Sequence, residues 1–189
     1  MKQKEISLNT KKALAESLKK AMKKKPFSKI TVSELIADCN INRKTFYYHF
    51  EDIYDLLKWM FEEEAINVLK HFDLLVDYEE ALNFVMDYVE QNDHIINCAY
   101  DSIGQEEMKR FFYADFYDIT LSIITHAEKQ NNYTLSDEFR TFMAKFYNEA
   151  IAGVFLDWVK HHDTQDRKKT TEYLTTLLKA SLDGLMQQK

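Results

Sequence analysis

The chain of 189 residues has few of the residues that mark short strands and tight turns. It contains one proline, Pro26, and three glycines, Gly104, Gly153 and Gly184. Because proline and glycine punctuate turns and hairpins, their scarcity argues against a sheet of many short strands. Hydrophobic residues make up 46% of the chain, which excludes a disordered protein. We therefore expect an all-α protein of about nine long helices joined by polar turns.

Cysteine and long apolar runs are scarce as well. Cys39 and Cys98 lie too far apart in the sequence to suggest a disulfide framework. The opening residues, MKQKEISLNTKK, lack the apolar core of a signal peptide. No apolar run approaches the roughly 20 residues that a membrane-spanning helix needs. These absences predict a reduced, cytoplasmic protein without a membrane partner.

Signals for catalysis or metal binding are weak. The sequence has no Gly-rich phosphate loop and no nucleophile motif. None of its six histidines follows a glutamate by three residues, as the helices of a di-iron carboxylate bundle require. His94 and Cys98 are four apart and could share a helix face as metal ligands, but ordinary packing is the favoured interpretation. His161 and His162 suit the negative end of a helix dipole. We expect no enzyme activity, no cofactor and no metal site.

Charge is divided unevenly along the chain. Residues 1–50 carry twelve Lys or Arg against four Asp or Glu, whereas the remaining residues carry thirteen against twenty-seven. Such a division suggests that the basic end meets a polyanion while the acidic body stays away from it. The alternative is a solvated, lysine-rich surface. The change of sign predicts two domains, residues 1–51 and 52–189, joined by a helix that starts near Asp52.

The stretch SELIADCNINRKTFYYHF, residues 33–50, has the pattern of two short helices around a tight turn. Thr31 and Glu34 have the spacing of a capping box at the start of the first helix. Asn40 tolerates the left-handed conformation that a tight turn needs, and Asn42 can cap the second helix. This order of elements is typical of the helix-turn-helix.

The second of these helices divides its residues between anchoring and hydrogen bonding. Phe46 and Phe50 are four apart and can hold it against a small core, so its N-terminal turn is free to enter a major groove. Arg43 can donate two hydrogen bonds to guanine, and the Thr45 methyl group can contact thymine. The alternative is a surface helix with ordinary polar residues. Side chains that can donate to phosphate oxygens follow on the same helix: Tyr47, Tyr48 and His49.

The stretch from Pro26 to Leu57 resembles the DNA-binding domain of the TetR family of transcriptional regulators. The family pattern is a T-V-x-x-I-A helix, a turn ending in an aliphatic residue, and a T-[LF]-Y-x-[HY]-F helix. The residues that fit it are Thr31, Val32, Ile36, Ala37, Ile41, Thr45, Phe46, Tyr47, His49 and Phe50. The DNA contacts that the resemblance implies are Ser33, Asn42, Arg43, Lys44, Thr45, Tyr47, Tyr48 and His49.

The chain departs from the family pattern at two positions. Asn40 stands where glycine is usual, which is a mild change. After Phe50 the family usually has a phosphate-binding lysine, where this chain has Ile53 among the carboxylates of Glu51, Asp52 and Asp55. We therefore expect this turn to stand off the DNA backbone, and the lysine-rich first helix to supply phosphate contacts instead.

The remainder of the chain is implied by the resemblance to be a helical ligand-binding and dimerisation domain. Its segment FYNEAIAGVFLDWVKHH is similar to the subgroup near the dihydroxyacetone kinase operon activator. The last two predicted helices carry wide apolar stripes, which predict a homodimer with a four-helix interface. Those stripes are Phe139, Met143, Phe146, Ala150, Val154 and Trp158, then Tyr173, Leu174, Leu177, Leu178, Leu182, Leu185 and Met186.

Together these features predict a sequence-specific regulator that binds a palindromic site on double-stranded DNA as a homodimer. An effector bound to the C-terminal domain would control it, and the sequence identifies neither the effector nor its binding residues. Two alternatives remain open. A protein partner could replace the small molecule, or the chain could be a helical interaction protein that has lost DNA binding.

Overall fold

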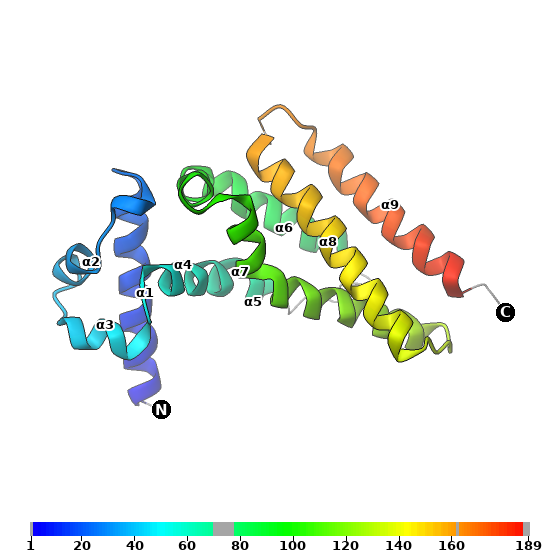
Figure 1. Ribbon diagram of the computed structural model, residues 1–189, viewed down its shortest axis with the longest axis horizontal. Helices are drawn as coiled ribbons and strands as arrows, with labels where there is room; N and C mark the ends of the chain where they lie inside the picture. The colour runs from blue at the N-terminus through cyan, green and yellow to red at the C-terminus, as the bar shows by residue number, and fades with distance from the viewer. Residues whose placement is uncertain (1, 70–77, 162, 187–189) are drawn as a thin grey trace. The chain divides into compact units, whose positions relative to one another are not determined.

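The computed structural model describes residues 2–69, 78–161 and 163–186, and these residues are almost entirely helical (Figure 1). No strand occurs among them, so the expected all-α fold is confirmed. None of the helices in these ranges is long and apolar enough to cross a membrane. Asp77, which has the spacing of a capping box with Glu80, lies outside the described residues, as does the histidine at position 162.

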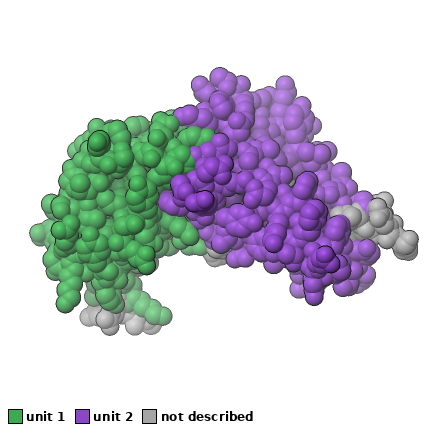
Figure 2. Space-filling view, viewed as in Figure 1, with its two compact units in different colours: residues 1–68, 92–104 green, residues 69–91, 105–189 purple. Residues whose placement is uncertain are grey.

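The chain packs as two compact units (Figure 2). The first contains residues 1–68 and 92–104, and the second contains residues 69–91 and 105–189. The elements up to the first gap are α1 (Lys2–Met22), the 3₁₀ turn η1 (Phe27–Lys29), α2 (Val32–Asp38), α3 (Arg43–His49), α4 (Ile53–Phe61), the π-helical turn η2 (Glu62–Ile66) and α5 (Asn67–Leu69). Those that follow are α6 (Tyr78–Gln91), α7 (Asp93–Gln130), α8 (Asp137–His161) and α9 (Arg167–Met186).

The core of the first unit forms where α1 packs against α2 and α4. Leu14, Leu18 and Met22 are four apart, which places them on one face of α1, and all three are buried. Phe46 and Phe50 are buried as well, so the anchoring of α3 by two aromatic rings is confirmed. The side chains at the start of α3 are therefore left outside the core.

The ends of α2, α3 and α4 follow local sequence signals. The backbone N–H of Thr31 donates to the Glu34 carboxylate at 2.9 Å, and the Thr31 hydroxyl accepts from the Glu34 N–H at 3.4 Å, which completes the capping box. Asn40 has a φ of 51°, the left-handed conformation expected of it. Asn42 caps α3 and Asp52 caps α4, as predicted.

The helix predicted to run without interruption from Asp52 is broken in the structure. It changes from α-helix to a π-helical turn at η2, where the N–H of Asn67 donates to the carbonyl of Glu62. Within the same turn, Glu64 forms an ion pair with Lys19 of α1. Such π-turns are rare and interrupt the regular hydrogen-bond ladder, which the hydrophobic pattern does not reveal.

Helix α7 changes direction at Gly104, which has φ 79° and ψ 166°. The part before this glycine belongs to the first unit and contacts the end of α1. The Nε2 atom of His94 lies 3.0 Å from the carbonyl oxygen of Met22, and the Cys98 thiol donates to the carbonyl of Lys25 at 3.7 Å. The last carbonyls of a helix lack partners within it, so His94 completes the end of α1, and Cys98 holds the loop that follows this helix. This geometry supports packing rather than metal binding for the pair.

The second unit is a helical bundle of α6, the part of α7 after Gly104, α8 and α9. Figure 1 shows α8 and α9 side by side and antiparallel, and Tyr147 of α8 hydrogen-bonds Ser181 of α9. Arg167 at the start of α9 holds α6 through the carboxylate of Asp87, at 2.6 Å. One hydrophobic cluster joins three of these helices and the loop before α8: Ile123, Ile124, Ala127, Leu135, Met143, Ala144 and Leu182.

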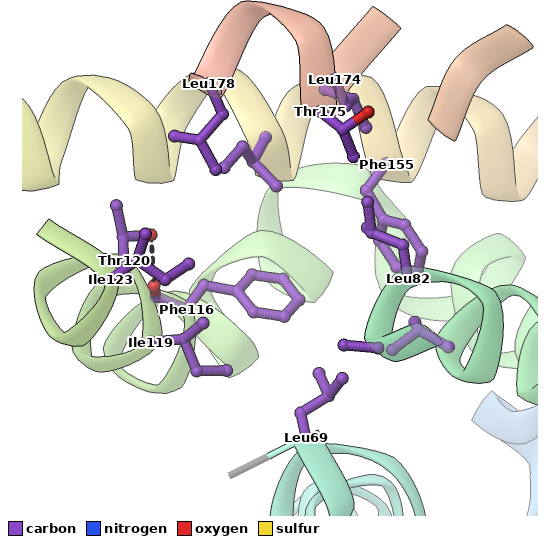
Figure 3. A pocket seen from close by; sticks show the side chains of 13 residues that line it. Leu69, Leu82, Phe116, Ile119, Thr120, Ile123, Phe155, Leu174, Thr175 and Leu178 are labelled. Carbon is purple, nitrogen blue, oxygen red and sulfur yellow. Dashed lines mark hydrogen bonds between the residues drawn. The ribbon is translucent and has the colours of Figure 1, made fainter. Parts of the chain in front are cut away.

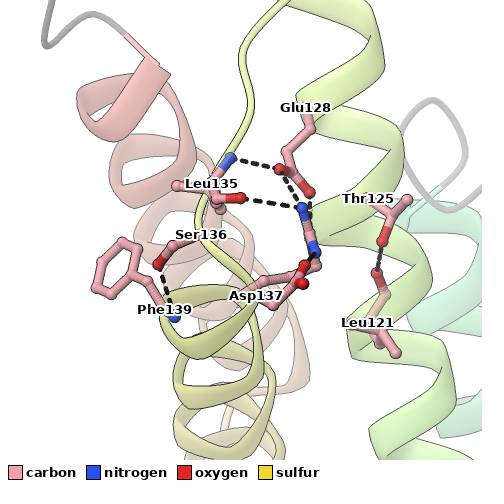
Figure 4. A network of polar contacts seen from close by, with 8 residues as sticks. Leu121, Thr125, Glu128, Leu135, Ser136, Asp137 and Phe139 are labelled. Carbon is pink, nitrogen blue, oxygen red and sulfur yellow. Dashed lines mark hydrogen bonds and ion pairs between the residues drawn. The ribbon is translucent and has the colours of Figure 1, made fainter.

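A polar network closes the connection between α7 and α8 (Figure 4). The buried carboxylate of Glu128 accepts from the backbone N–H of Leu135 at 2.6 Å and from Nε of Arg140 at 2.7 Å. Arg140 also pairs with Asp137. The Arg140 guanidinium is the main cause of the lowered pKa of Glu128, so this carboxylate is ionised at neutral pH.

We predict that Glu128→Gln lowers the free energy of unfolding by about 1.5–3 kcal/mol at pH 7, because hydrogen bonds to a charged group are lost. The folded-state pKa of Glu128 is lowered, so its stabilisation is complete above its usual value of 4.5 and is lost as the pH falls through the folded value. The difference between variant and parent should therefore vanish in acid. Urea denaturation followed by circular dichroism measures it, with the exposed Glu138→Gln as control. Equal stability of all three proteins at pH 7 would contradict the prediction.

Candidate functional site

Helix α3 presents its polar side chains to solvent. Arg43 and Lys44 are exposed at its first turn, and Tyr47 and Tyr48 are 51% and 76% exposed. The Arg43 guanidinium lies 6.0 Å from the centre of the Tyr47 ring. This cation–π contact favours a conformation in which the Arg43 side chain lies along the exposed face of α3. Exposed tyrosines offer a binding partner both ring surface and a hydroxyl group.

Asn42, Thr45 and Ser33 have different surroundings. The side-chain oxygen of Asn42 accepts from the Thr45 N–H at 2.8 Å and from the Thr45 hydroxyl at 3.1 Å. This bond engages the hydroxyl proton of Thr45, whose oxygen can still accept a hydrogen bond. Ser33 is exposed on α2.

His49 is only partly available to a ligand. It is half-buried, and its Nδ1 atom lies 3.5 Å from the Ser7 hydroxyl. Burial, with a smaller contribution from nearby Lys11, lowers the pKa of His49. The imidazole is therefore neutral at pH 7, and it would meet a phosphate as a hydrogen-bond donor rather than as a cation.

Several lysines of the first unit already have partners within it. The Lys11 ammonium group lies 5.4 Å from the Phe50 ring centre and 5.3 Å from that of Trp59. Further ion pairs engage basic residues of α1 and the loop that follows it: Lys19 with Glu16 and Glu64, Lys20 with Asp38, and Lys25 with Glu34. The net charge of residues 1–50 thus overstates how many cations are free to meet a polyanion. Lys12 remains exposed on α1.

The carboxylates between α3 and α4 bond to the backbone of their own turn. Asp52 accepts from the Asp55 N–H at 2.9 Å, and Asp55 accepts from the Glu51 N–H at 3.0 Å. Negative charge at this position also suits the positive end of the α4 dipole. Ile53 is half-buried at the first position of α4.

The second unit contains an apolar cavity of about 120 Å³ between its helices (Figure 3). Folded proteins contain few voids larger than a water molecule. The space is partly open to solvent. Its lining residues are Leu69, Ala81, Leu82, Val85, Phe116, Ile119, Thr120, Ile123, Ile151, Phe155, Leu174, Thr175 and Leu178.

The only hydroxyl groups in that lining donate back into their own helices. Thr120 donates to the carbonyl of Phe116 at 2.7 Å, and Thr175 donates to the carbonyl of Thr171 at 2.9 Å. No lining residue is charged. The cavity therefore offers contact area to an occupant and almost no hydrogen-bond donors.

Helix α8 carries an exposed row of aromatic rings. Phe142 and Phe146 are 61% and 57% exposed, and the ring centres of Phe139 and Phe142, like those of Phe142 and Phe146, are 6.4 Å apart. The stripe predicted for this helix is wrong at Met143 and Trp158, which lie in the core of the second unit. The stripe predicted for α9 is also narrower than expected, because Leu182 is buried and Leu174 and Leu178 line the cavity. Tyr173 and Leu177 remain exposed on α9.

No signal in the sequence identifies the cavity. Four of its lining residues follow the helical spacing i, i+3, i+4, i+7 on α7: Phe116, Ile119, Thr120 and Ile123. The same spacing marks any helix face that packs against a solid core, so periodicity cannot distinguish a void from filled space.

Comparison with known proteins agrees with this fold. Residues 77–180, more than half of the chain, match the family model TetR_C_8, described as "Transcriptional regulator C-terminal region". The HTH-type dhaKLM operon transcriptional activator DhaS of Lactococcus lactis subsp. lactis (strain IL1403) is 23% identical over 148 residues, which is 78% of each chain. A solved structure of a dihydroxyacetone kinase operon activator DhaS superposes with a TM-score of 0.70 and 21% identity, covering 92% of this chain and 96% of that one. The chain belongs to the TetR family of transcriptional regulators.

Proposed function

We propose that the protein regulates transcription by binding a palindromic DNA site through α3, with residues 1–51 as the DNA-binding domain and residues 52–189 as the regulatory domain. The observation that carries this proposal is the division of α3, in which Phe46 and Phe50 are buried while the first turn and the tyrosines are exposed. Arg43 and Thr45 contact base edges, which supplies sequence preference. The remaining contacts fix the register on the phosphate backbone: Ser33, Asn42, Lys44, Tyr47, Tyr48 and His49.

Two copies of the chain pair through α8 and α9. The exposed rings of Phe139, Phe142 and Phe146, with Leu177 of α9, support this assignment, because a row of exposed apolar side chains on neighbouring helices is typical of an interface. A two-fold axis places the same surface on both copies. It also sets the two α3 helices about 34–36 Å apart, or somewhat more, to reach successive major grooves.

An effector bound to the second unit changes the spacing of the α3 helices. The name of one relative describes an activator of the dhaKLM operon, and on that likeness we include activation, as well as repression, in the proposal. A protein partner in place of a small molecule is the alternative. Trp59 of α4 reports on the change, because its ring lies 5.7 Å from that of Phe50 at the end of α3.

A mobility-shift assay tests the proposal on duplex DNA from upstream of the protein's own gene. Retention that survives excess unrelated DNA supports a sequence-specific regulator. Retention that disappears with the competitor indicates non-specific binding, and no retention at all supports the alternative of an interaction protein that has lost DNA binding.

Ile53→Lys tests where the turn before α4 lies on the DNA. If the turn is near the backbone, the new lysine should tighten binding at low salt and steepen the slope of log affinity against log salt by about 0.9. Fluorescence anisotropy at several salt concentrations measures both, with Ile53→Gln as a control that changes packing but adds no charge. An unchanged slope would show that the turn stands off the DNA. Weaker binding by both variants would show that Ile53 acts by packing.

A further inference from the structure

We infer that the cavity of the second unit binds a compact, uncharged, apolar molecule about the size of one aromatic ring. This inference rests on the proposed function, because it names the chemical class of the effector assumed there. The lining does not suit polar trioses or phosphorylated sugars.

The volume sets the size of the occupant. The cavity measures about 120 Å³ and is partly open to solvent, and it is lined by side chains of α6, α7, α8 and α9 together with Leu69 at the end of α5. An apolar cavity of about 150 Å³ in another protein stays dry and binds benzene or xenon. A molecule of roughly six to eight heavy atoms therefore fits within this volume.

The lining sets the chemistry of the occupant. Eleven of its thirteen residues are apolar, and the hydroxyl protons of Thr120 and Thr175 are already bonded to carbonyls of their own helices. On entering the cavity, the hydroxyl groups of a triose would lose their hydrogen bonds to water. At most two threonine oxygens would be there to accept hydrogen bonds in their place. A phosphate would find no cation. Burying polar groups without partners is unfavourable, whereas an apolar molecule loses no hydrogen bonds on entry. In Figure 3, the Phe116 ring points into the space between the helices, where it can pack on the face of a planar ligand.

One helix that lines the cavity also continues into the first unit. Helix α7 supplies Phe116, Ile119, Thr120 and Ile123 to the lining. The same helix continues in sequence through Gly104 to the segment that completes the end of α1 in the first unit. An occupant that changes the packing of α7 thus acts on an element shared by both units.

Benzene is the test probe, with dihydroxyacetone as the polar comparison. We expect benzene to bind saturably and to raise the Tm of the whole protein by about 3–6 °C at about ten times its Kd. Dihydroxyacetone at the same concentrations as benzene should leave the Tm of the protein unchanged. Ligand-observed NMR gives Kd independently of the thermal shift. No saturable benzene binding, or competition of dihydroxyacetone with benzene, would overturn the inference.

Cavity-filling variants locate the bound probe. Ala81→Leu on α6 and Ile151→Phe on α8 add volume from two different helices of the lining, so at least one should fold with the helix content of the parent. Each folded filler should lose benzene binding by at least about tenfold. Thr175→Val is the matched control, because it keeps the volume and removes the hydroxyl, and it should bind benzene at least as tightly as the parent. Benzene binding that persists unchanged in a folded filler would place the probe elsewhere and contradict the inference.

The same samples separate this inference from the proposed function. Selective operator retention without benzene binding overturns the cavity assignment and leaves the regulator intact. Benzene binding that the fillers abolish, in a protein without selective DNA retention, supports the cavity and overturns the proposed function.

Discussion

Phe146→Asp should convert the protein from a dimer into a monomer and lower its operator affinity by about 10²–10⁴-fold. The ring of Phe146 is 57% exposed at one end of the aromatic row on α8, and a carboxylate there would be buried against the same row of the second copy. Operator affinity falls with the dimer because two linked half-site contacts are replaced by one. Sedimentation velocity at micromolar concentration and fluorescence anisotropy on operator DNA measure the two effects.

Thr141→Asp is the control for this change. Thr141 is exposed on the same helix but outside the aromatic row, so the same charge there should leave both association and DNA binding close to those of the parent. A parent protein that sediments as a monomer, or a Phe146→Asp variant that remains a dimer, would show that α8 does not form the interface.

Arg43→Ala should weaken operator binding by about 1–3 kcal/mol and relax the preference at one base pair in each half-site. The reason is that arginine donates two hydrogen bonds to guanine, and Arg43 is exposed at the first turn of α3 with no ion pair among the described residues. Titrations against the operator and against unrelated DNA measure the change in specificity.

Tyr47→Phe is the comparison for Arg43→Ala. It removes only the hydroxyl that we assign to a phosphate oxygen, so it should weaken binding by a similar factor on every sequence. If Arg43→Ala also lowers specific and non-specific affinity by the same factor, then Arg43 contacts the backbone and the base-reading assignment is wrong.

The helix-turn-helix could be predicted residue by residue because its signals are local. The Thr31 and Glu34 capping box, the left-handed Asn40 and the Asn42 cap each depend on a few neighbouring positions, and the structure confirms all of them. Local hydrogen bonding to the backbone is the physical cause of these preferences, so the sequence contains them fully.

Other features depend on packing between distant segments and could not be predicted. Met143 and Trp158 share the helical spacing of the exposed stripe, but the fold turns both into the core. The lysine-rich first helix was expected to meet phosphate, yet the ammonium group of its Lys11 lies over the rings of Phe50 and Trp59. In each case the residue type allows both environments, and only the tertiary arrangement selects one. The cavity and the π-helical turn at η2 have no local signal at all.

Selection of bound sequences from random duplex DNA by the 189-residue protein tests whether a homodimer reads DNA through α3. A homodimer that reads DNA through α3 should enrich an inverted repeat, with half-site centres about one helical turn apart or somewhat more. The same selection with Arg43→Ala should return the same repeat with one position per half-site relaxed. Enrichment of no sequence, or of a site without two-fold symmetry, would contradict the account.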